Sequence, residues 1–362
     1  SHGINVLTGH RLAAVHETPS SLTLTLSGPS GDHSLATDLL ILAAGVRPES
    51  DLASQAGLTV NARGAIVVDD HMCTSDPDVY AVGDAIAVTD FVTSQEAYVP
   101  LAGPANRQGR IAADNICGLD SRYTGTQGSS ILKAFDMTVA ATGLSEHAAQ
   151  QQGVRYEKVF TFSPSHAGYY PGGKGMSIKT LYDPVDGRIL GAQIVGFDGV
   201  DKRCDVLATA IRAGMTAYDL TRLELCYAPP FSSAKDPVNM VGFVIENTLT
   251  GKVKNFHWHD VASLPRDGSV TLLDVRTPTE RASGYIDGFV HIPLDDLRAR
   301  YTELDPAKPV YIHCHSGLRS YVACRLLAGY GFNCYNLSGG WRLYESVTAD
   351  RAVQELGCYD PK

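Results

Sequence analysis

The sequence predicts a multidomain chain that combines α/β and α+β modules. Its 362 residues are enough for two or three domains. A buried, strand-like run at 38–45 closes with glycine, and alternating strand patterns dominate from residue 131. Near the C-terminal end, an apolar strand passes through a cysteine-containing loop into a helical pattern. Each of these three observations indicates a module of its own.

Composition excludes several classes of protein. Acidic residues outnumber basic residues by 39 to 30, which argues against nonspecific nucleic-acid binding. No apolar run reaches the ~18–20 residues of a membrane span, and the start shows no signal-peptide pattern. Eight scattered cysteines, without CxxC pairs or Cys/His ligand spacing, favour free thiols in the cytoplasm over a disulfide framework. We therefore expect no bound metal, no membrane partner and no nucleic acid.

The first third of the chain reads as strands with one helix. Period-2 alternation and apolar runs predict the strands, and small residues followed by spaced isoleucines predict the helix. The expected strands are 4–7, 22–26, 38–45, 65–68 and 78–84, and the expected helix is 101–117.

From residue 131 the pattern becomes that of an α+β module. Turn chemistry at 183–187 joins two of its strands, and 251–255 is the expected linker into the last module. The expected strands are 138–141, 156–162, 176–182 and 189–196, and the expected helices are 201–214 and 236–250.

The cysteine loop carries the most informative chemistry. The strand Val310–His313 leads to Cys314, and a helix follows the loop. Loop N–H groups, the positive end of that helix and Arg319 would all favour a thiolate, which is the reactive form of cysteine. Four residues separate Cys314 from Arg319, one fewer than in phosphate-handling tyrosine-phosphatase loops. The tighter ring suits a single sulfur atom better than a phosphoryl group.

The run 314–320, Cys-His-Ser-Gly-Leu-Arg-Ser, resembles the active-site loop of the rhodanese (sulfurtransferase) family. Motifs at 272–276, 286–294 and 336–341 agree in order, although Tyr285 stands where many relatives carry His. The resemblance implies an α/β rhodanese-like domain over 256–362, in which Cys314 carries a persulfide and Arg319 assists. The residues expected to form the persulfide loop with them are His315, Ser316, Gly317, Leu318 and Ser320.

Residues 44–48 and 74–84 resemble the pyridine-nucleotide disulfide oxidoreductases. The resemblance implies a partial, doubly wound FAD/NAD(P)-binding region: the tail of a nicotinamide domain at 1–45 and the C-terminal part of a FAD domain at 46–128. Asp84 would bond a ribityl hydroxyl of FAD, and Gly83 would let the backbone approach the cofactor. The N-terminus of a helix that begins near Pro100 would point at the flavin ring. The other residues expected at FAD are Leu101, Ala102 and Phe231.

Residues 166–172 and 225–237 resemble the coenzyme A-disulfide and persulfide reductases. The resemblance implies a dimerisation domain at 129–250 and a homodimer in which two tyrosines sit beside the partner's redox cysteine. By motif position these are Tyr169 and Tyr227, with Tyr170 as the alternative to Tyr169, because consecutive strand residues face opposite ways. A phenol can donate a proton to a leaving thiolate.

The chain contains no G-x-G-x-x-G after a strand, and neither Cys73 nor Cys117 fits the redox cysteine. We therefore expect a C-terminal portion of a longer enzyme, whose N-terminal segment completes the FAD and NAD(P)H sites. NADH and NADPH stay equally open, as does any contact of Arg107 or Arg110 with coenzyme A.

The expected function is FAD-dependent reduction of coenzyme A disulfide, persulfide or polysulfide with NAD(P)H, coupled to sulfane-sulfur transfer at Cys314 between small thiols. Two alternatives remain: a rhodanese-like docking or regulatory module on a flavoprotein, and a cysteine-dependent phosphatase or arsenate reductase. A third, structural interpretation is that Cys314 is a buried core thiol.

Overall fold

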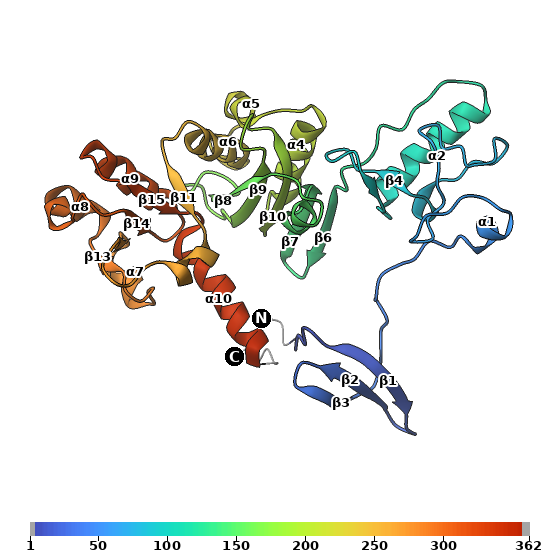
Figure 1. Ribbon diagram of the computed structural model, residues 1–362, viewed down its shortest axis with the longest axis horizontal. Coiled ribbons are helices and arrows are strands. Elements are labelled where there is room, and N and C mark those ends of the chain that lie inside the picture. Colours follow the sequence, from blue (N-terminus) through green and yellow to red (C-terminus); the bar gives the residue numbers. More distant parts are fainter. Residues whose placement is uncertain (1–3, 357–362) are drawn as a thin grey trace. The chain divides into compact units, whose positions relative to one another are not determined.

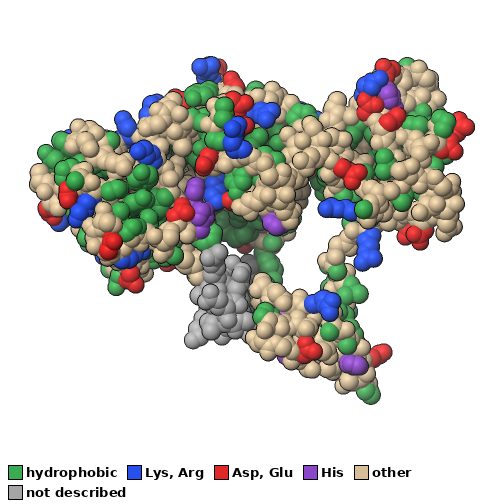
Figure 2. All heavy atoms as spheres, viewed as in Figure 1, with side chains coloured by type: hydrophobic (Ala, Val, Ile, Leu, Met, Phe, Trp, Pro, Cys, Tyr) green, Lys and Arg blue, Asp and Glu red, His purple; other side chains and the backbone are tan. Residues whose placement is uncertain are grey.

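The computed structural model describes residues 4–356, with side chains to residue 349 (Figure 1). Contacts divide the chain into a small unit, Ser1–Gly45 with Arg342–Lys362, and a large unit, Val46–Trp341. No helix in the described part is both long and apolar enough to cross a membrane. Figure 2 shows basic and acidic side chains interspersed over the visible face.

The small unit contains an antiparallel sheet in the order β1-β2-β3. The expected strand 22–26 is confirmed, whereas 4–7 lies outside any strand. The expected buried strand at 38–45 is also wrong: Leu39, Ile41 and Leu42 are 70–77% exposed. A buried strand needs neighbours on both edges, and no described strand pairs with this segment. The strands are β1 (Arg11–Glu17), β2 (Leu22–Gly28) and β3 (Gly31–Thr37).

Residues 46–128 pack around a small core of Met72, Ile86, Val88 and Ala112. The expected helix 101–117 is confirmed as α2 (Ala102–Ile116). The strands expected at 65–68 and 78–84 do not form. These segments make only isolated β-bridges, because no described strand extends the pairing beyond them. The remaining elements are α1 (Asp51–Gln55), a 3₁₀ helix (Gly83–Ala85), β4 (Val88–Thr89) and β5 (Glu96–Ala97).

An antiparallel sheet in the order β6-β7-β10-β9-β8 follows. It confirms all four strands and both long helices expected between 131 and 250. Helices α4 and α6 pack against it, with Ile194, Leu207 and Val241 in the shared core (Figure 1). The elements are β6 (Ser130–Ala134), β7 (Met137–Gly143), α3 (Glu146–Gln151), β8 (Glu157–Pro164), β9 (Gly175–Tyr182), β10 (Ile189–Gly196), α4 (Val200–Arg212), α5 (Ala217–Arg222) and α6 (Pro237–Leu249).

The last module is a parallel sheet in the order β11-β15-β14-β12-β13. Lys254 and Asn255, expected in the linker, instead begin β11 and pair with β15. The elements are β11 (Lys254–Phe256), a 3₁₀ helix (Trp258–Ser263), β12 (Thr271–Asp274), α7 (Pro278–Ala282), β13 (Val290–His291), α8 (Leu294–Arg300), a 3₁₀ helix (Tyr301–Glu303), β14 (Val310–His313), α9 (Leu318–Gly329), β15 (Cys334–Leu337) and α10 (Gly340–Leu356). Central β14 delivers Cys314 to the sheet's carboxyl edge, where ligand sites of parallel sheets form.

Candidate active site: a cysteine loop and a tyrosine pair

Cys314 follows β14 directly, and the loop after it turns tightly into α9. The Trp341 N–H donates to the Cys314 carbonyl at 2.8 Å, which ties the loop to the start of α10. At Gly340, with φ of +58°, a Cβ would lie 2.6 Å from that same carbonyl oxygen. Only glycine therefore lets the two backbones approach this closely.

Two donors converge on the cysteine sulfur. The Gly317 N–H donates to Cys314 Sγ at 3.1 Å, and the Ser320 hydroxyl donates at 3.3 Å. Gly317 has a φ of +100° and stands just before α9, so the helix start also faces the loop. Cys314 is fully buried, as the core-thiol interpretation expects, but these donors distinguish it from an ordinary core thiol. Donors aimed at one atom stabilise negative charge there.

Arg319, whose charge is expected to favour a thiolate at Cys314, forms a hydrogen-bonded ion pair with Glu280. Its guanidinium donates to both Glu280 carboxylate oxygens, at 2.8 and 2.6 Å. These hydrogen bonds lower the pKa of Glu280 to about 2, so the pair is ionised at neutral pH. The carboxylate is held in reach because it also caps α7 through the Thr277 N–H and hydroxyl. The Arg319 guanidinium beside the cysteine loop is therefore already paired with the Glu280 carboxylate.

A buried ion pair positions α7 and hence Glu280. Asp274 and Arg276 are fully buried and bonded to each other at 2.8 Å, and Arg276 also donates to the Glu280 carbonyl at 3.3 Å. Burial raises the pKa of Asp274, but bonds from Arg276 and the nearby His313 lower it overall. The sequence reading named the motif 272–276 without assigning it this role. The Thr-Pro-Thr-Glu capping box after it was the available signal.

We expect the imidazoles of buried His313 and half-buried His257 to make this module acid-sensitive. Burial lowers the pKa of His313 and of His257 to about 4, from 6.5. Between pH 6.5 and 4 the unfolded chain binds protons that the folded chain refuses, so stability falls as pH falls, by up to about 1.4 kcal/mol per pH unit for each group. Urea unfolding followed by the fluorescence of Trp258 and Trp341 between pH 7 and 5 measures this slope. A midpoint independent of pH in that range would contradict the prediction.

Tyr169 and Tyr227 come together as expected from their motifs. Their hydroxyl oxygens lie 2.9 Å apart, and the side chains are exposed. The hydrogen bond with Tyr227 raises the pKa of Tyr169. Tyr170 instead turns its ring edge-on to His166, at a centroid distance of 5.6 Å. The geometry thus favours Tyr169 over Tyr170 as the partner of Tyr227.

Arg203, which the sequence reading missed, holds the two tyrosine-bearing loops together. It is buried, and its Nη2 donates to the Ser165 carbonyl, the Ser232 hydroxyl and Asp236 at 2.9–3.1 Å. Burial raises the pKa of Asp236, but bonds from Ser232, the Val238 amide and Arg203 lower it overall. A signal was present: Arg203 lies four residues before Leu207, on the buried stripe of α4.

The residues expected at FAD are only partly gathered. Gly83 has a φ of +77° and donates its N–H to buried Gln108 at 2.8 Å, while Asp84 beside it is exposed. Burial, and then the charge of nearby Asp84, raise the pKa of Tyr98, whose buried hydroxyl lacks a partner among the described residues. Pro100, Leu101 and Ala102 lead into α2. Phe231 lies in a turn between α5 and α6.

These residues fit a polyhydroxylated cofactor such as FAD. Asp84 offers an exposed carboxylate for a hydroxyl, Tyr98 offers an unpartnered phenol, and the start of α2 presents free backbone N–H groups. Arg107 stacks on Tyr123, and Arg110 is 4.0 Å from Asp114, so both are engaged along α2.

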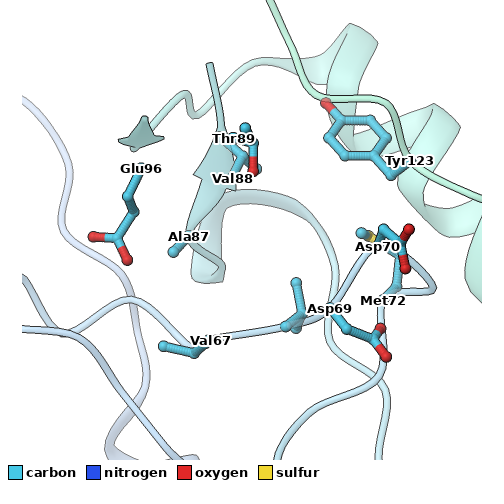
Figure 3. Close-up of a pocket in the computed structure, with 10 residues that line it drawn as sticks. Val67, Asp69, Asp70, Met72, Ala87, Val88, Thr89, Glu96 and Tyr123 are labelled. Carbon is cyan, nitrogen blue, oxygen red and sulfur yellow. The ribbon is translucent and has the colours of Figure 1, made fainter. Parts of the chain in front are cut away.

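A separate hollow of about 360 Å³ lies beside β4 (Figure 3). Asp69, Asp70 and Glu96 line it together with apolar side chains and Tyr123. None of the residues expected at FAD lines it. Its three carboxylates make it a poor place for phosphate groups, so it is distinct from the expected cofactor site.

Comparisons with known proteins identify each module. Residues 1–109 match the pyridine nucleotide-disulphide oxidoreductase family, 130–237 its dimerisation domain and 257–346 the rhodanese-like domain. These matches confirm the expected fold class. The crystal structure of reduced Bacillus anthracis CoADR-RHD is 48% identical, with a TM-score of 0.89, and the match covers 94% of this chain and 60% of that one.

Two further relatives agree. An NAD-dependent persulfide reductase from A. fulgidus is 36% identical with a TM-score of 0.82, over 91% of this chain and 59% of that one. A coenzyme A disulfide reductase from Staphylococcus aureus is 36% identical over 57% of this chain and 47% of that protein. The chain thus spans about half the length of the curated relatives it matches. The chain belongs to the pyridine nucleotide-disulphide oxidoreductase family, and carries that family's dimerisation domain fused to a rhodanese-like domain.

Proposed function

We propose that this chain takes part in the FAD- and NAD(P)H-dependent reduction of coenzyme A disulfide, persulfide or polysulfide, and that this reduction is coupled to sulfur transfer at Cys314. The observation that carries the sulfur-transfer proposal is the pair of donors, Gly317 N–H and Ser320 hydroxyl, directed at Cys314 Sγ. Relatives named as persulfide and coenzyme A disulfide reductases support the substrate class.

The proposed transfer has two balanced steps. The Cys314 thiolate attacks the outer sulfur of a donor persulfide, forming a Cys314 persulfide and releasing the donor's thiolate. An acceptor thiolate, with coenzyme A as the proposed carrier, then takes that outer sulfur and restores the Cys314 thiolate. The loop donors hold the negative charge of both sulfur species. His315, Ser316 and Leu318 complete the loop.

The reductive half depends on the tyrosine pair. FAD, when bound, supplies electrons from NAD(P)H to the disulfide or persulfide. Tyr169 and Tyr227 would hold a proton for the leaving thiolate, since each phenol can donate to sulfur. We propose that residues 129–250 form a homodimer and that the segments 1–45 and 46–128 belong to the nicotinamide and FAD domains.

Intact-mass spectrometry after incubation with thiosulfate tests the first step. We expect the chain to gain one sulfur atom, localised to Cys314 by peptide mapping and removed by a thiol acceptor. Cys117→Ser, which changes an exposed thiol, serves as the matched control and should gain the atom equally. Sulfur on another cysteine, or none on a folded chain, would overturn the proposal.

Glu280→Gln should lower the KM for anionic sulfur donors. The substitution keeps the shape of the side chain but removes the charge that pairs with Arg319. For a partly exposed pair worth about 1 kcal/mol, we expect the KM for thiosulfate to fall about fivefold. Steady-state kinetics measures the change, and an uncharged organic trisulfide as sulfur donor provides the control. An unchanged or higher KM for thiosulfate would show that Arg319 does not serve anion binding.

A docking role for the rhodanese-like module is the second candidate, because Cys314 is fully buried. Labelling with iodoacetamide near neutral pH separates the two functions. In a sulfur carrier, Cys314 must become accessible to the reagent and be labelled. In a docking module, Cys314 would stay unlabelled during the time in which the exposed cysteines react. Phosphatase activity is disfavoured because the Arg319 guanidinium is paired with Glu280. An assay with an aryl phosphate tests this.

A further inference from the structure

Arg276 is fully buried in the rhodanese-like module and contacts more than its ion-pair partner Asp274. Its guanidinium also donates to the carbonyl groups of Glu280 and Gly284, at 3.3 and 2.8 Å. Its Cζ lies 4.7 Å from the centre of the Trp341 ring. One planar cation therefore joins the residues after β12 to α7 and to the start of α10.

The contact with Trp341 reaches the reactive cysteine. The backbone N–H of Trp341 donates to the carbonyl oxygen of Cys314 at 2.8 Å. The indole packs directly on the backbone of Gly284, because a Cβ added there would lie 2.7 Å from Trp341 Cζ2. A cation over an aromatic face is attracted to it, more strongly when both are removed from water. The Arg276 guanidinium thereby fixes the residue that holds the backbone of Cys314.

The contact with the Glu280 carbonyl reaches the other end of the loop. The Glu280 carboxylate holds Arg319 of α9 through two hydrogen bonds. Arg276 therefore acts on the cysteine loop at both ends, on Cys314 at the start and on Arg319 at the finish. Between these ends lies Gly317, whose N–H donates to Cys314 Sγ at 3.1 Å.

We propose that Arg276 is a positioning residue for sulfur transfer, which holds the two ends of the cysteine loop so that the Gly317 N–H points at Cys314 Sγ. The inference rests on the proposed sulfur transfer at Cys314. Asp274 neutralises the guanidinium, which allows a cation to be buried at this position.

Arg276→Lys and Arg281→Lys form a matched pair of variants. Both arginines donate to Asp274, and both variants keep a positive charge beside it. Arg281 also donates to the Phe289 carbonyl, which belongs to neither end of the loop. Lysine has neither the flat face that stacks on Trp341 nor the several fixed donors of a guanidinium.

Hydrogen–deuterium exchange measured by mass spectrometry tests the positioning without any sulfur donor. In Arg276→Lys we expect the amides of Gly317 and Trp341 to exchange about tenfold faster, while those of β15 keep the parent rate. In Arg281→Lys all of these amides should exchange as in the parent. Unchanged Gly317 and Trp341 amides in Arg276→Lys, or an equal increase throughout the sheet, would refute the positioning role.

The pH dependence of kcat/KM for sulfur transfer connects the positioning to the reaction. Without its Gly317 donor the Cys314 thiolate is less stable, so the acid limb of the profile should move up by about one pH unit in Arg276→Lys. A residue that only stabilises the fold would leave this limb in place. Transfer in the parent with an unmoved limb in Arg276→Lys contradicts this inference alone, whereas no transfer in the parent contradicts the proposed function.

Trp341→Leu tests the same connection even if Arg276→Lys does not fold. It removes the aromatic face and leaves the pair of Arg276 and Asp274 intact. We expect faster exchange at Gly317 and an upward shift of the acid limb. Trp258→Leu, which changes the other tryptophan of the chain, should leave both measurements at the parent values. Equal results for the two tryptophan variants would remove Trp341 from the proposed connection.

Discussion

Cys314→Ser should lower sulfurtransferase activity by at least about 1000-fold while the chain stays folded. Serine keeps the size of the side chain and accepts the bonds from Gly317 and Ser320, but its hydroxyl does not ionise near neutral pH and cannot form a persulfide. Steady-state transfer from thiosulfate to a thiol acceptor measures the loss.

The matched control for this prediction is Cys117→Ser, which changes an exposed thiol just after α2. That variant should retain the transfer rate of the parent. Urea unfolding of the Cys314→Ser variant should show a midpoint close to that of the parent. Transfer that persists in Cys314→Ser would remove the loop from the reaction and leave the docking role as the better reading.

Arg203→Ala should destabilise the chain by about 3–5 kcal/mol, because it removes the cation hydrogen-bonded to the buried Asp236 carboxylate and leaves only Lys202, at 3.9 Å. The side chains of Arg203 and Asp236 are 2% exposed, so water cannot replace the lost bonds. The substitution also releases the Ser165 carbonyl and the Ser232 hydroxyl, which belong to the loops that carry Tyr169 and Tyr227. Thermal or urea unfolding gives the free-energy change.

Arg155→Ala is the control, since Arg155 pairs with Asp183 on the surface and is 65% exposed. Its effect should stay within about 1 kcal/mol. Arg203→Lys keeps the charge but loses the planar guanidinium with its several donors. Its loss of stability should lie between those of Arg203→Ala and Arg155→Ala. Equal losses for Arg203→Ala and Arg155→Ala would show that the buried network contributes little.

Local patterns predicted the elements whose partners lie within the described chain. The four strands between 138 and 196 pair with one another, and alternating burial along Glu157–Pro164 matches its period-2 pattern. The run 310–320 likewise encodes a strand, a turn that needs Gly317 and a helix start. Such features depend on residues near one another in sequence, so they can be read without coordinates.

Three failed strand predictions share one cause. The apolar runs at 38–45, 65–68 and 78–84 carry strand propensity, but none finds a continuous ladder in the described residues. Strand formation needs a neighbour to accept its backbone hydrogen bonds, and propensity alone does not provide one.

By itself, the sequence determined the module types and singled out Cys314, Tyr169 and Tyr227 as candidate site residues, because each lies in a short motif. Only the tertiary structure decided that Arg319 pairs with Glu280 and that Arg203 joins the two tyrosine loops. Those partners are far apart in the chain, and charge pairing and burial act through space rather than along the sequence.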